Sequence, residues 1–560
     1  MKRVYLLALF TFLIVLLVFS CKSKLAPVTH PIISDNAINT IVENESESDI
    51  NYIYDFLDSI QTENENTIAG ETLHKKQDLY EYYSKKDFQR YWTDSLRSGD
   101  AIIALITSWK EGLNPKDYHL EALLDLHHYL IEHPDDIKTG SEFDLLLSDG
   151  LLSYTDHLIN GKLDPKSLYP SWNFFSRNLP HNVIDQLILA IDNDQIDPFL
   201  LSLTPQTREY RGFREGIIKY TNIVSMGGWK DLPDVNKVEP LSNSALTPLL
   251  KQRLYAEGYE VIPDSNRIYD QELVEQVKLF QISSGLMPDG VIGKNTIKAF
   301  NESAESKLNK LKVNMERSRW VLDGEMNEYI VVNIAKYQLY YLDSGSVIYT
   351  TKVMVGKDET QTPAFRDELE YIVFNPTWTL PQSISSKETL PHLIRDSLYL
   401  KNNNMVIIDS KGQVLSDSGI VWSDYNEEYF PFIIRQEPGP GNALGRVKFL
   451  FPNKYAVYLH DTPSKYLFAK EERAFSHGCI RVQNPLDFSE LILSRQDSNW
   501  TMDSIRTVID SAATMNVRLK KSIPIYIMYW TAGVDENERL FFVPDIYGRD
   551  ERILKALGEL

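Results

Sequence analysis

The sequence has little cysteine and little positive charge. Its 560 residues include two cysteines, Cys21 and Cys479, and 58 basic residues stand against 78 acidic ones, for a formal net charge of −20. Because phosphate binding requires clustered Lys and Arg, we expect no nucleic-acid partner. The hydrophobic fraction of 43% is ordinary for a globular protein. The length exceeds what a single hydrophobic core supports, so about two to four domains are expected.

The N-terminus predicts export from the cytoplasm. Lys2 and Arg3 precede the apolar run "VYLLALFTFLIVLLVF", which Ser20 and Cys21 follow. A basic start, an apolar stretch and a small residue before the cut site are typical of a secretory signal, and the run is slightly short for a membrane span. The end "VFSC" resembles a bacterial lipobox, whose cysteine becomes the lipidated first residue. We therefore expect a signal peptide over 1–21 and a periplasmic protein anchored by lipid on Cys21, in the outer rather than the inner membrane; an uncleaved signal anchor is the alternative.

Lipidation of Cys21 would leave Cys479 without a disulfide partner in an oxidising compartment. Cys479 lies in "AFSHGCIRVQNP", with His477 two positions before it and Arg481 two positions after it. Three roles are open for it: an apolar filler, a metal ligand or a nucleophile. An unpaired thiol in an exported protein is exposed to oxidation, so its presence favours a reactive role.

The region before the cysteine is polar and then helical. Residues 22–66 are rich in Asn, Asp, Glu, Ser and Thr, which predicts a flexible tether, with a short helix within Ile53 to Ile60. From 67 to 235 apolar residues recur at spacings of three and four, as in "SEFDLLLSDGLLSYTDHLI", which indicates amphipathic helices. Residues 236–303 contain three further helical stretches joined by "MPDGVIGKNT". This unit resembles the three-helix peptidoglycan-binding domain, with an unrelated helical bundle as the alternative.

The periodicity becomes strand-like after about residue 325. "EYIVVNIAKYQLYYLDSGSVIYTTKVMVG" contains alternating, β-branched and aromatic runs interrupted by Asp343-Ser344-Gly345, which is a hairpin signal. Strand character continues in "KYAVYLHD" and returns in "SIPIYIMYW". Residues 394–440 are turn-rich and aromatic, so we expect an excursion from the sheet there. The last domain is therefore predicted to be mostly β.

Two histidines are candidates for activating Cys479. A thiol reacts as its thiolate, and a nearby imidazole can take its proton near neutral pH. His477 would share a face with Cys479 on an extended backbone, because the two are two residues apart. His460, in "YLHDTP", precedes the cysteine by 19 positions and could arrive from a neighbouring strand. The spacing alone does not choose between them.

A resemblance to a known family distinguishes between the two histidines. His460, sixteen intervening residues and then Ser476-His477-Gly478-Cys479 resemble the signature of the YkuD-type L,D-transpeptidases. The stretches "VMVGKDETQTPAF", "NPTWTLPQSI" and "RQEPGPGNALGRVKFLFPN" are similar to its large multi-domain branch. The resemblance implies that Cys479 is the nucleophile and His460 the general base.

Further roles follow from the same resemblance. Ser476, His477 and Gly478 would shape the loop, and the amides of Gly478 and Cys479 would face the oxyanion. Arg481 would bind a substrate carboxylate or pair structurally, and Tyr458 would contact substrate.

The implied architecture is multi-domain, with an α-helical scaffold domain, a three-helix peptidoglycan-binding domain and a mostly-β catalytic domain bearing a cap. The expected segments are signal peptide 1–21, tether 22–66, scaffold 67–235, peptidoglycan-binding domain 236–303, catalytic domain 325–535 with its capping subdomain at 394–440, and C-terminal tail 536–560.

The implied reaction joins peptidoglycan stem peptides. Cys479 would attack the third residue of a stem tetrapeptide, release D-Ala and pass the acyl group to a second stem, which gives a 3→3 cross-link; carbapenems would acylate the same thiol. No metal or cofactor is expected. Alternatives are an L,D-carboxypeptidase that hydrolyses the same acyl-enzyme, a non-catalytic peptidoglycan-binding lipoprotein, and a zinc site formed by His460, Asp461, His477 and Cys479.

Overall fold

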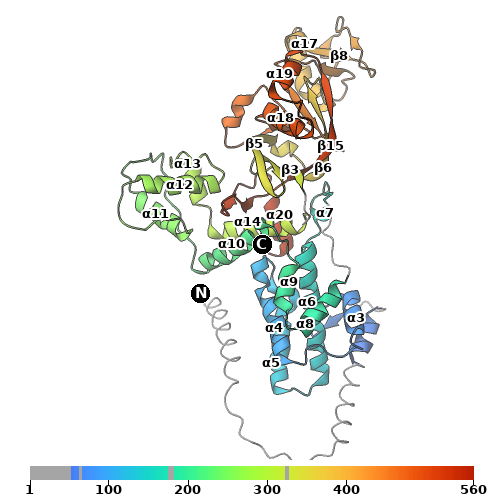
Figure 1. Cartoon of the computed structure of the whole chain (residues 1–560), viewed down its shortest axis with the longest axis vertical. Coiled ribbons are helices and arrows are strands. Elements are labelled where there is room, and N and C mark those ends of the chain that lie inside the picture. Colours follow the sequence, from blue (N-terminus) through green and yellow to red (C-terminus); the bar gives the residue numbers. More distant parts are fainter. Residues whose placement is uncertain (1–51, 62–65, 175–181, 322–326, 560) are drawn as a thin grey trace, which may run out of the picture.

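A computed structural model describes residues 52–61, 66–174, 182–321 and 327–559. The expected signal peptide, Cys21 and most of the expected tether lie outside these ranges. Within them, no helix combines the length and the apolar character needed to cross a membrane. A helical region, a small helical unit and a β-rich unit follow one another along the chain (Figure 1), which confirms the predicted multi-domain fold.

The helical region packs around one long helix. Asp136 caps the N-terminus of α6 (Ile137–Asn160) by accepting from the Thr139 amide, and apolar residues on most sides of α6 are buried. Residues 52–61 are helical, as predicted for Ile53 to Ile60, and Ile53, Leu57 and Ile60 enter the same core, so this part of the expected tether is packed against the helical region. The other elements of this region are β1 (Thr67–Ile68), β2 (Glu71–Thr72), α3 (Lys76–Ser84), α4 (Ser95–Ile106), η1 (Thr107–Glu111), η2 (Pro115–Tyr118), α5 (Leu120–Glu132), α7 (Pro165–Leu168), α8 (Val183–Asp192) and α9 (Ile196–Ser202).

Two paired helices join the helical region to the rest of the molecule. Helices α10 (Arg208–Ser225) and α14 (Ala304–Arg319) pack together and share a core with the hairpin of β16 (Ala532–Val534) and β17 (Leu540–Phe542). Helix α20 (Arg549–Leu557) packs on α14, where Arg317 pairs with Asp550 at 2.7 Å. The prediction of a C-terminal tail over 536–560 is therefore wrong, because this segment buries its own apolar residues against α10 and α14.

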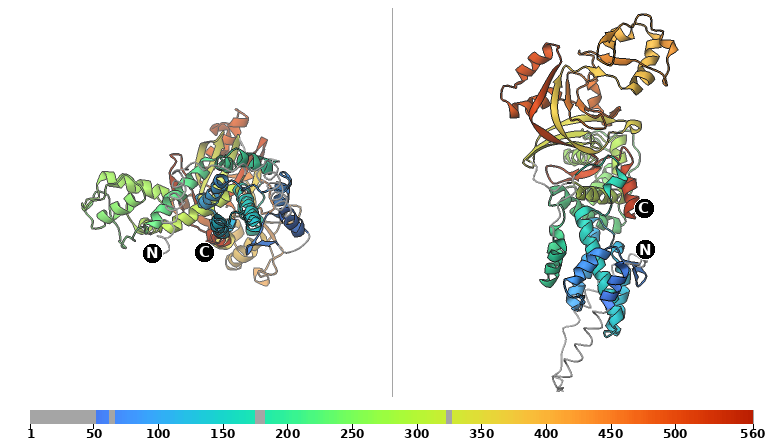
Figure 2. Two further views of the ribbon diagram at one scale, coloured as in Figure 1. Left: turned by 90° about the horizontal axis from the view of Figure 1, so that it is seen from below. Right: turned by 90° about the vertical axis from the view of Figure 1, so that its right-hand side faces the viewer.

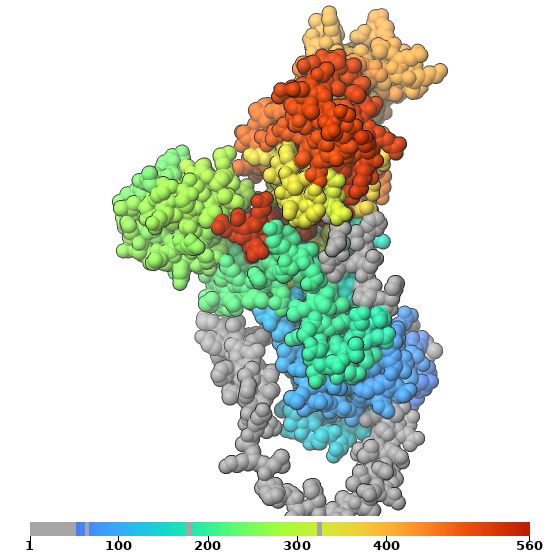
Figure 3. Space-filling model, viewed as in Figure 1, coloured from blue at the N-terminus to red at the C-terminus, as the bar shows by residue number. Residues whose placement is uncertain are grey.

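The small helical unit lies to one side of this helix pair (Figure 3). It consists of α11 (Thr247–Ala256), α12 (Gln271–Ser283) and α13 (Lys294–Phe300). Phe280 and Phe300 stack with ring centroids 3.7 Å apart in its core. Gly290, in the predicted turn, has a φ of 72°, and its amide donates to the side chain of Gln281 at 2.9 Å.

A buried carboxylate connects this unit to the helix pair. Glu257 accepts from Arg253 at 2.8 Å, from the Tyr220 hydroxyl at 2.6 Å and from Lys307. Burial raises the pKa of Glu257, but the charges of Lys307 and Arg253 outweigh burial and lower it from 4.5 to about 2. Two cations facing one carboxylate favour its ionised form.

We expect Glu257→Gln to lower the free energy of unfolding by about 3–5 kcal/mol, because it leaves buried cations unpaired. Since the folded-state pKa is depressed, the contribution of Glu257 is present above pH 4.5 and is lost as the pH falls toward 2. Thermal unfolding between pH 3 and 7 measures both effects. The exposed Glu272→Gln on α12 is the control; equal losses for the two variants would contradict the assignment.

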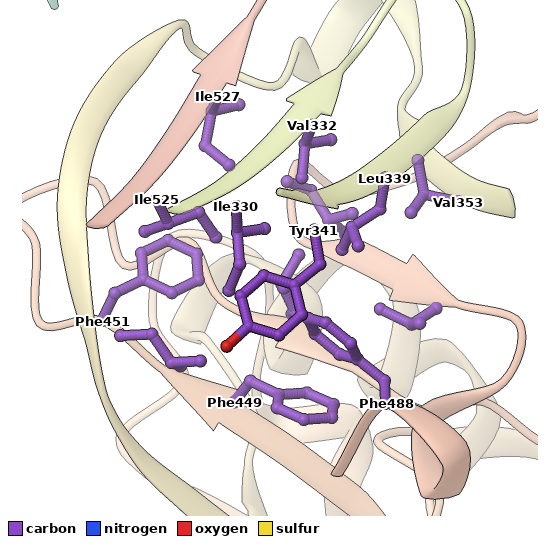
Figure 4. Packing of buried hydrophobic residues seen from close by; sticks show 14 of the residues in the cluster. Ile330, Val332, Leu339, Tyr341, Val353, Phe449, Phe451, Phe488, Ile525 and Ile527 are labelled. Atoms are coloured by element: carbon purple, nitrogen blue, oxygen red, sulfur yellow. The ribbon is translucent and has the colours of Figure 1, made fainter. Parts of the chain in front are cut away.

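The β-rich unit is built on a nine-stranded sheet. The order is β13-β5-β14-β12-β11-β6-β15-β3-β4, and β4 also pairs with β5, so the sheet closes into a barrel with β13 at its side. Its interior is apolar: Tyr341, Phe449 and Phe488 meet there (Figure 4). The strands are β3 (Glu328–Asn333), β4 (Gln338–Asp343), β5 (Ser346–Gly356), β6 (Phe365–Phe374), β11 (Val447–Leu450), β12 (Leu459–His460), β13 (Ala474–Ser476), β14 (Ile480–Val482) and β15 (Met515–Met528), with η3 (Asp358–Thr360), η6 (Lys465–Ala469), α18 (Pro485–Gln496) and α19 (Met502–Asp510) between them.

The predicted hairpin occurs between β4 and β5. Ser344 and Gly345 form its two-residue loop, and both have positive φ, 49° and 78°. Two left-handed residues in succession match the twist of the flanking strands.

A separate subdomain projects from the barrel (Figure 2). It has its own sheet, ordered β7-β10-β8-β9, and its own core, which includes Leu390, Leu393 and Ile434. It begins at Trp378, before the expected start at residue 394, and it is a folded unit rather than a run of turns. Its elements are β7 (Trp378–Thr379), α15 (Gln382–Ile384), η4 (Ser385–Thr389), α16 (Leu390–Arg395), α17 (Tyr399–Asn402), β8 (Met405–Ile408), β9 (Val414–Leu415), η5 (Trp422–Asp424) and β10 (Ile433–Gln436). We call residues 378–436 the cap.

Candidate active site

Two neighbouring parallel strands bring the predicted site residues together. In the register of β12 and β14, Leu459 faces Ile480 and His460 faces Arg481. Leu459 and Ile480 are fully buried in the barrel interior. Because side chains alternate along a strand, Tyr458, His460, Cys479 and Arg481 all lie on the opposite side.

The loop before Cys479 is held by hydrogen bonds. The Ser476 hydroxyl donates to the carbonyl of Cys479 at 2.5 Å and accepts from the amide of Gly478 at 3.1 Å. Thr360 and Thr362 donate to the carbonyls of Ser476 and Gly478 at 3.0 and 2.9 Å. Gly478 has a φ of 110°, which L-residues with a side chain rarely adopt. In this arrangement the Gly478 amide is engaged by Ser476, which differs from the expectation that it faces an oxyanion.

The thiol of Cys479 is half-buried and lies 3.6 Å from the carbonyl oxygen of Ala456. Burial raises the pKa of this thiol. Hydrogen bonds from the backbone and side chain of Tyr458, followed by the charges of Lys448 and Arg481, act in the opposite direction. The resting group is therefore a neutral thiol surrounded by groups that stabilise its anion.

His460 is fixed in one tautomer. Its side chain is buried, and Nδ1 lies 2.5 Å from the carbonyl oxygen of Asp461. A carbonyl can only accept, so Nδ1 carries the proton and Nε2 has a free lone pair. Burial and then the charge of Arg481 lower the pKa of His460 to about 3. At neutral pH the imidazole is thus uncharged and able to accept a proton.

His477 has a different environment. It is exposed, and its Nε2 lies 2.7 Å from Oε1 of Glu388 in the cap. The two histidines near Cys479 therefore differ: His460 is buried on the sheet, and His477 contacts the cap.

One cation of the site was not anticipated from the sequence. Lys448 lies on β11 directly opposite His460, and its Nζ is 3.8 Å from the centroid of the Tyr458 ring. The signal was present in "GRVKFLF", where a lysine interrupts an otherwise apolar strand whose next residue, Phe449, is buried. Among the residues that the structure describes, no group of three or more His, Cys, Asp or Glu side chains gathers in a way that would hold a metal ion.

Three families match successive parts of the chain. Residues 77–216 match a "Scaffold domain", residues 244–300 a "Putative peptidoglycan binding domain", and residues 327–508 the YkuD "L,D-transpeptidase catalytic domain". The third match covers the cap and the barrel strands from β3 to β14, and the three matches together confirm the resemblance seen in the sequence. Along the chain, a match to a peptidoglycan-binding domain thus precedes a match to a catalytic domain.

One curated relative agrees with the family matches. A curated protein of Haemophilus influenzae named "Putative L,D-transpeptidase" is 33% identical over 285 residues, which are 50% of this chain and 57% of that protein. The chain thus spans little more than half the length of that relative.

Two solved structures were also matched. An L,D-transpeptidase from Xylanimonas cellulosilytica is 14% identical, with a TM-score of 0.17, and covers 53% of this chain and 99% of its own. Another from Stackebrandtia nassauensis is 13% identical, with a TM-score of 0.20, and covers 54% and 96%. At these scores neither structure adds to the assignment.

Proposed function

We propose that this protein is an L,D-transpeptidase that forms 3→3 cross-links between peptidoglycan stem peptides through a thioester on Cys479. The observation that carries the proposal is the pairing of β12 with β14, which sets a neutral His460 with a free Nε2 on the same side of the sheet as the thiol. The family match of residues 327–508 supports the reaction class.

The proposed reaction has two steps. In the first, Nε2 of His460 takes the thiol proton, and the sulfur attacks the carbonyl carbon of the third residue of a tetrapeptide stem. The bond to D-Ala breaks, and the departing amine takes the proton from His460. In the second, the side-chain amine of another stem attacks the thioester, loses its proton to His460 and regenerates the thiol. The Cys479 amide is the candidate oxyanion donor, because Ser476 engages the Gly478 amide.

Transfer and hydrolysis share the first step and differ in the second. If water replaces the acceptor amine, the enzyme is an L,D-carboxypeptidase. The test is to incubate a tetrapeptide donor with and without a second stem and to analyse products by mass spectrometry. Cross-linked dimer as the main product supports transfer; tripeptide alone, even with excess acceptor, would replace the proposal by the carboxypeptidase.

We also propose that the protein acts in the periplasm as a lipoprotein anchored through Cys21. The support is the apolar run that ends in "VFSC". Membrane fractionation of wild type and Cys21→Ser tests this: the wild type should sediment with outer-membrane vesicles, and the variant should not carry lipid. A wild type without lipid would exclude the anchor.

We expect the cap to be mobile in the free enzyme and ordered by acylation. The contact between Glu388 and His477, at 2.7 Å and exposed, is a weak tie between the cap and the loop that bears Cys479. A closed cap would keep water from the thioester. Hydrogen exchange in the cap should be fast before and slower after acylation, and Glu388→Gln should raise the ratio of hydrolysis to transfer.

The control for this prediction is Glu428→Gln, which removes an exposed carboxylate elsewhere in the cap. Slow exchange in the free enzyme, unchanged by acylation, would mean that the cap is a fixed structural insertion.

A further inference from the structure

Two cations flank His460 in the barrel wall. Lys448 on β11 and Arg481 on β14 each face His460 in the strand register, one from either side. Paired positions on neighbouring strands have Cβ atoms about 4.5–5.5 Å apart, so the three side chains form a row across the sheet. The residues next in sequence, Val447, Phe449, Ile480 and Val482, are buried in the barrel, so the row faces outward on the side of the thiol.

Neither cation has an acidic partner among the residues that the structure describes. No ion pair or hydrogen bond links Lys448 or Arg481 to a carboxylate there, and Nε of Arg481 is buried without a hydrogen-bond partner. Burial lowers the pKa of both side chains, and in each case the group that raises it is Cys479. Half-buried cations without counter-ions are costly, which makes this row a site for an anion.

The ring of Tyr458 orients Lys448, one of the two cations. Lys448 Nζ lies 3.8 Å from its centroid, within the range of a cation–π contact, and this directs the ammonium toward the strand that bears His460. The ammonium therefore lies over the Tyr458 ring, whose centroid is 5.6 Å from that of His460, and no carboxylate of the described residues pairs with it.

We propose that Lys448 and Arg481 together bind the free C-terminal carboxylate of the D-amino acid that leaves the donor stem. This inference rests on the proposed transpeptidation and adds a requirement for an unblocked C-terminus at the fourth position. Lys448 is then a specificity-determining residue.

The chemistry of the leaving group supports this assignment. His460 must deliver a proton to the departing nitrogen, so that nitrogen lies next to the imidazole. A single carbon separates the nitrogen from the terminal carboxylate of D-Ala. The carboxylate therefore lies within the reach of the side chains on either side of His460, which are Lys448 and Arg481. Charge-assisted hydrogen bonds to a carboxylate are among the strongest that a protein offers.

A stem with another residue beyond position four has an uncharged amide at this point. Such a stem would leave both cations without a counter-ion, so the row would reject it. The same cations also favour the thiolate of Cys479, so a test must separate carboxylate binding from activation of the thiol.

The experiment compares two donor tetrapeptides, one ending in D-Ala and one ending in D-alaninamide. Acylation of Cys479 is followed by release of D-Ala or D-alaninamide under single-turnover conditions. The variants are Lys448→Met and the conservative Lys448→Arg, and the control is Lys520→Met, an exposed lysine on β15 that pairs with Asp497 at 3.0 Å. The pH dependence of iodoacetamide alkylation reports the thiol pKa of each variant.

We expect wild type and Lys520→Met to prefer the free acid by about 10- to 100-fold, the range of a hydrogen bond to a charged group. Lys448→Met should slow acylation by both donors through the thiol, but it should slow acylation by the acid donor much more, so that most of the preference is lost; Lys448→Arg should restore the preference. Losses of equal size with both donors, so that the preference for the free acid is unchanged, would overturn the inference and leave Lys448 only as an activator of the thiol. No preference in the wild type would overturn it as well.

Failure of the inference and failure of the proposed function are distinguishable. If neither donor forms a thioester on Cys479 in the wild type, the proposed function fails. If both donors acylate Cys479 at the same rate, the transpeptidase proposal survives and the carboxylate site does not.

Discussion

Replacing Cys479 with alanine is expected to abolish acyl transfer completely. The sulfur is the atom that forms the thioester in the proposed reaction, and alanine offers no nucleophile in its place. Cys479→Ser should be equally inactive, because an alcohol is much harder to deprotonate than a thiol. Intact-mass spectrometry after incubation with a carbapenem should show one adduct on the wild type and none on Cys479→Ala.

The thermal stability of Cys479→Ala shows whether the variant is inactive because it lacks the thiol or because it is unfolded. Cys479 is half-buried, and the loop around it is held by Ser476, Thr360 and Thr362 rather than by the thiol, so the thermal unfolding midpoint should change little. A carbapenem adduct that persists on a folded Cys479→Ala would mean that another group is the nucleophile.

Replacing His460 with alanine is expected to slow acylation by about 10²–10⁴-fold, the range of a removed general base. Nδ1 is bonded to the carbonyl of Asp461, so Nε2 is the atom that accepts the thiol proton. The lowered pKa of His460 keeps the imidazole neutral across the physiological range, so the rate should not fall between pH 8 and 6 through protonation of this group. Stopped-flow acylation by a carbapenem measures the rate.

His477→Ala is the matched control. His477 is exposed and contacts Glu388, so its loss should change acylation far less and should act mainly through the cap. Because His460 is buried, His460→Gln serves as a second variant that keeps the volume of the side chain. Equal losses for His460→Ala and His477→Ala, or a larger loss for His477→Ala, would show that His460 is not the general base.

The different positions of the two histidines could not be predicted from the spacing of residues in the sequence. Spacing left His460 and His477 equivalent, and the family resemblance alone favoured His460. The parallel pairing of β12 with β14 then puts His460 beside Arg481 and leaves His477 facing the cap. Such a pairing joins segments distant in the chain, which local periodicity does not report.

Two segments were predicted with the wrong extent for the same reason. The cap begins at Trp378 because β7 pairs with β10, more than fifty residues later in the chain. The C-terminal segment is helical and packed because Ile553 and Leu557 lie against α14, far away in sequence. Composition alone predicted a turn-rich segment and a tail, because it does not show which distant segments these stretches pack against.

The sequence by itself determined the order of the domains, the hairpin at Ser344 and Gly345, and the motif that carries His460 and Cys479. These features depend on local periodicity, on turn residues or on fixed spacing, all of which can be read along the chain. Only the tertiary structure decided that Lys448 belongs to the site, that Ser476 engages the Gly478 amide, and that Lys448 and Arg481 flank His460 without counter-ions. Strand register sets these relations, and register follows from how the whole barrel closes.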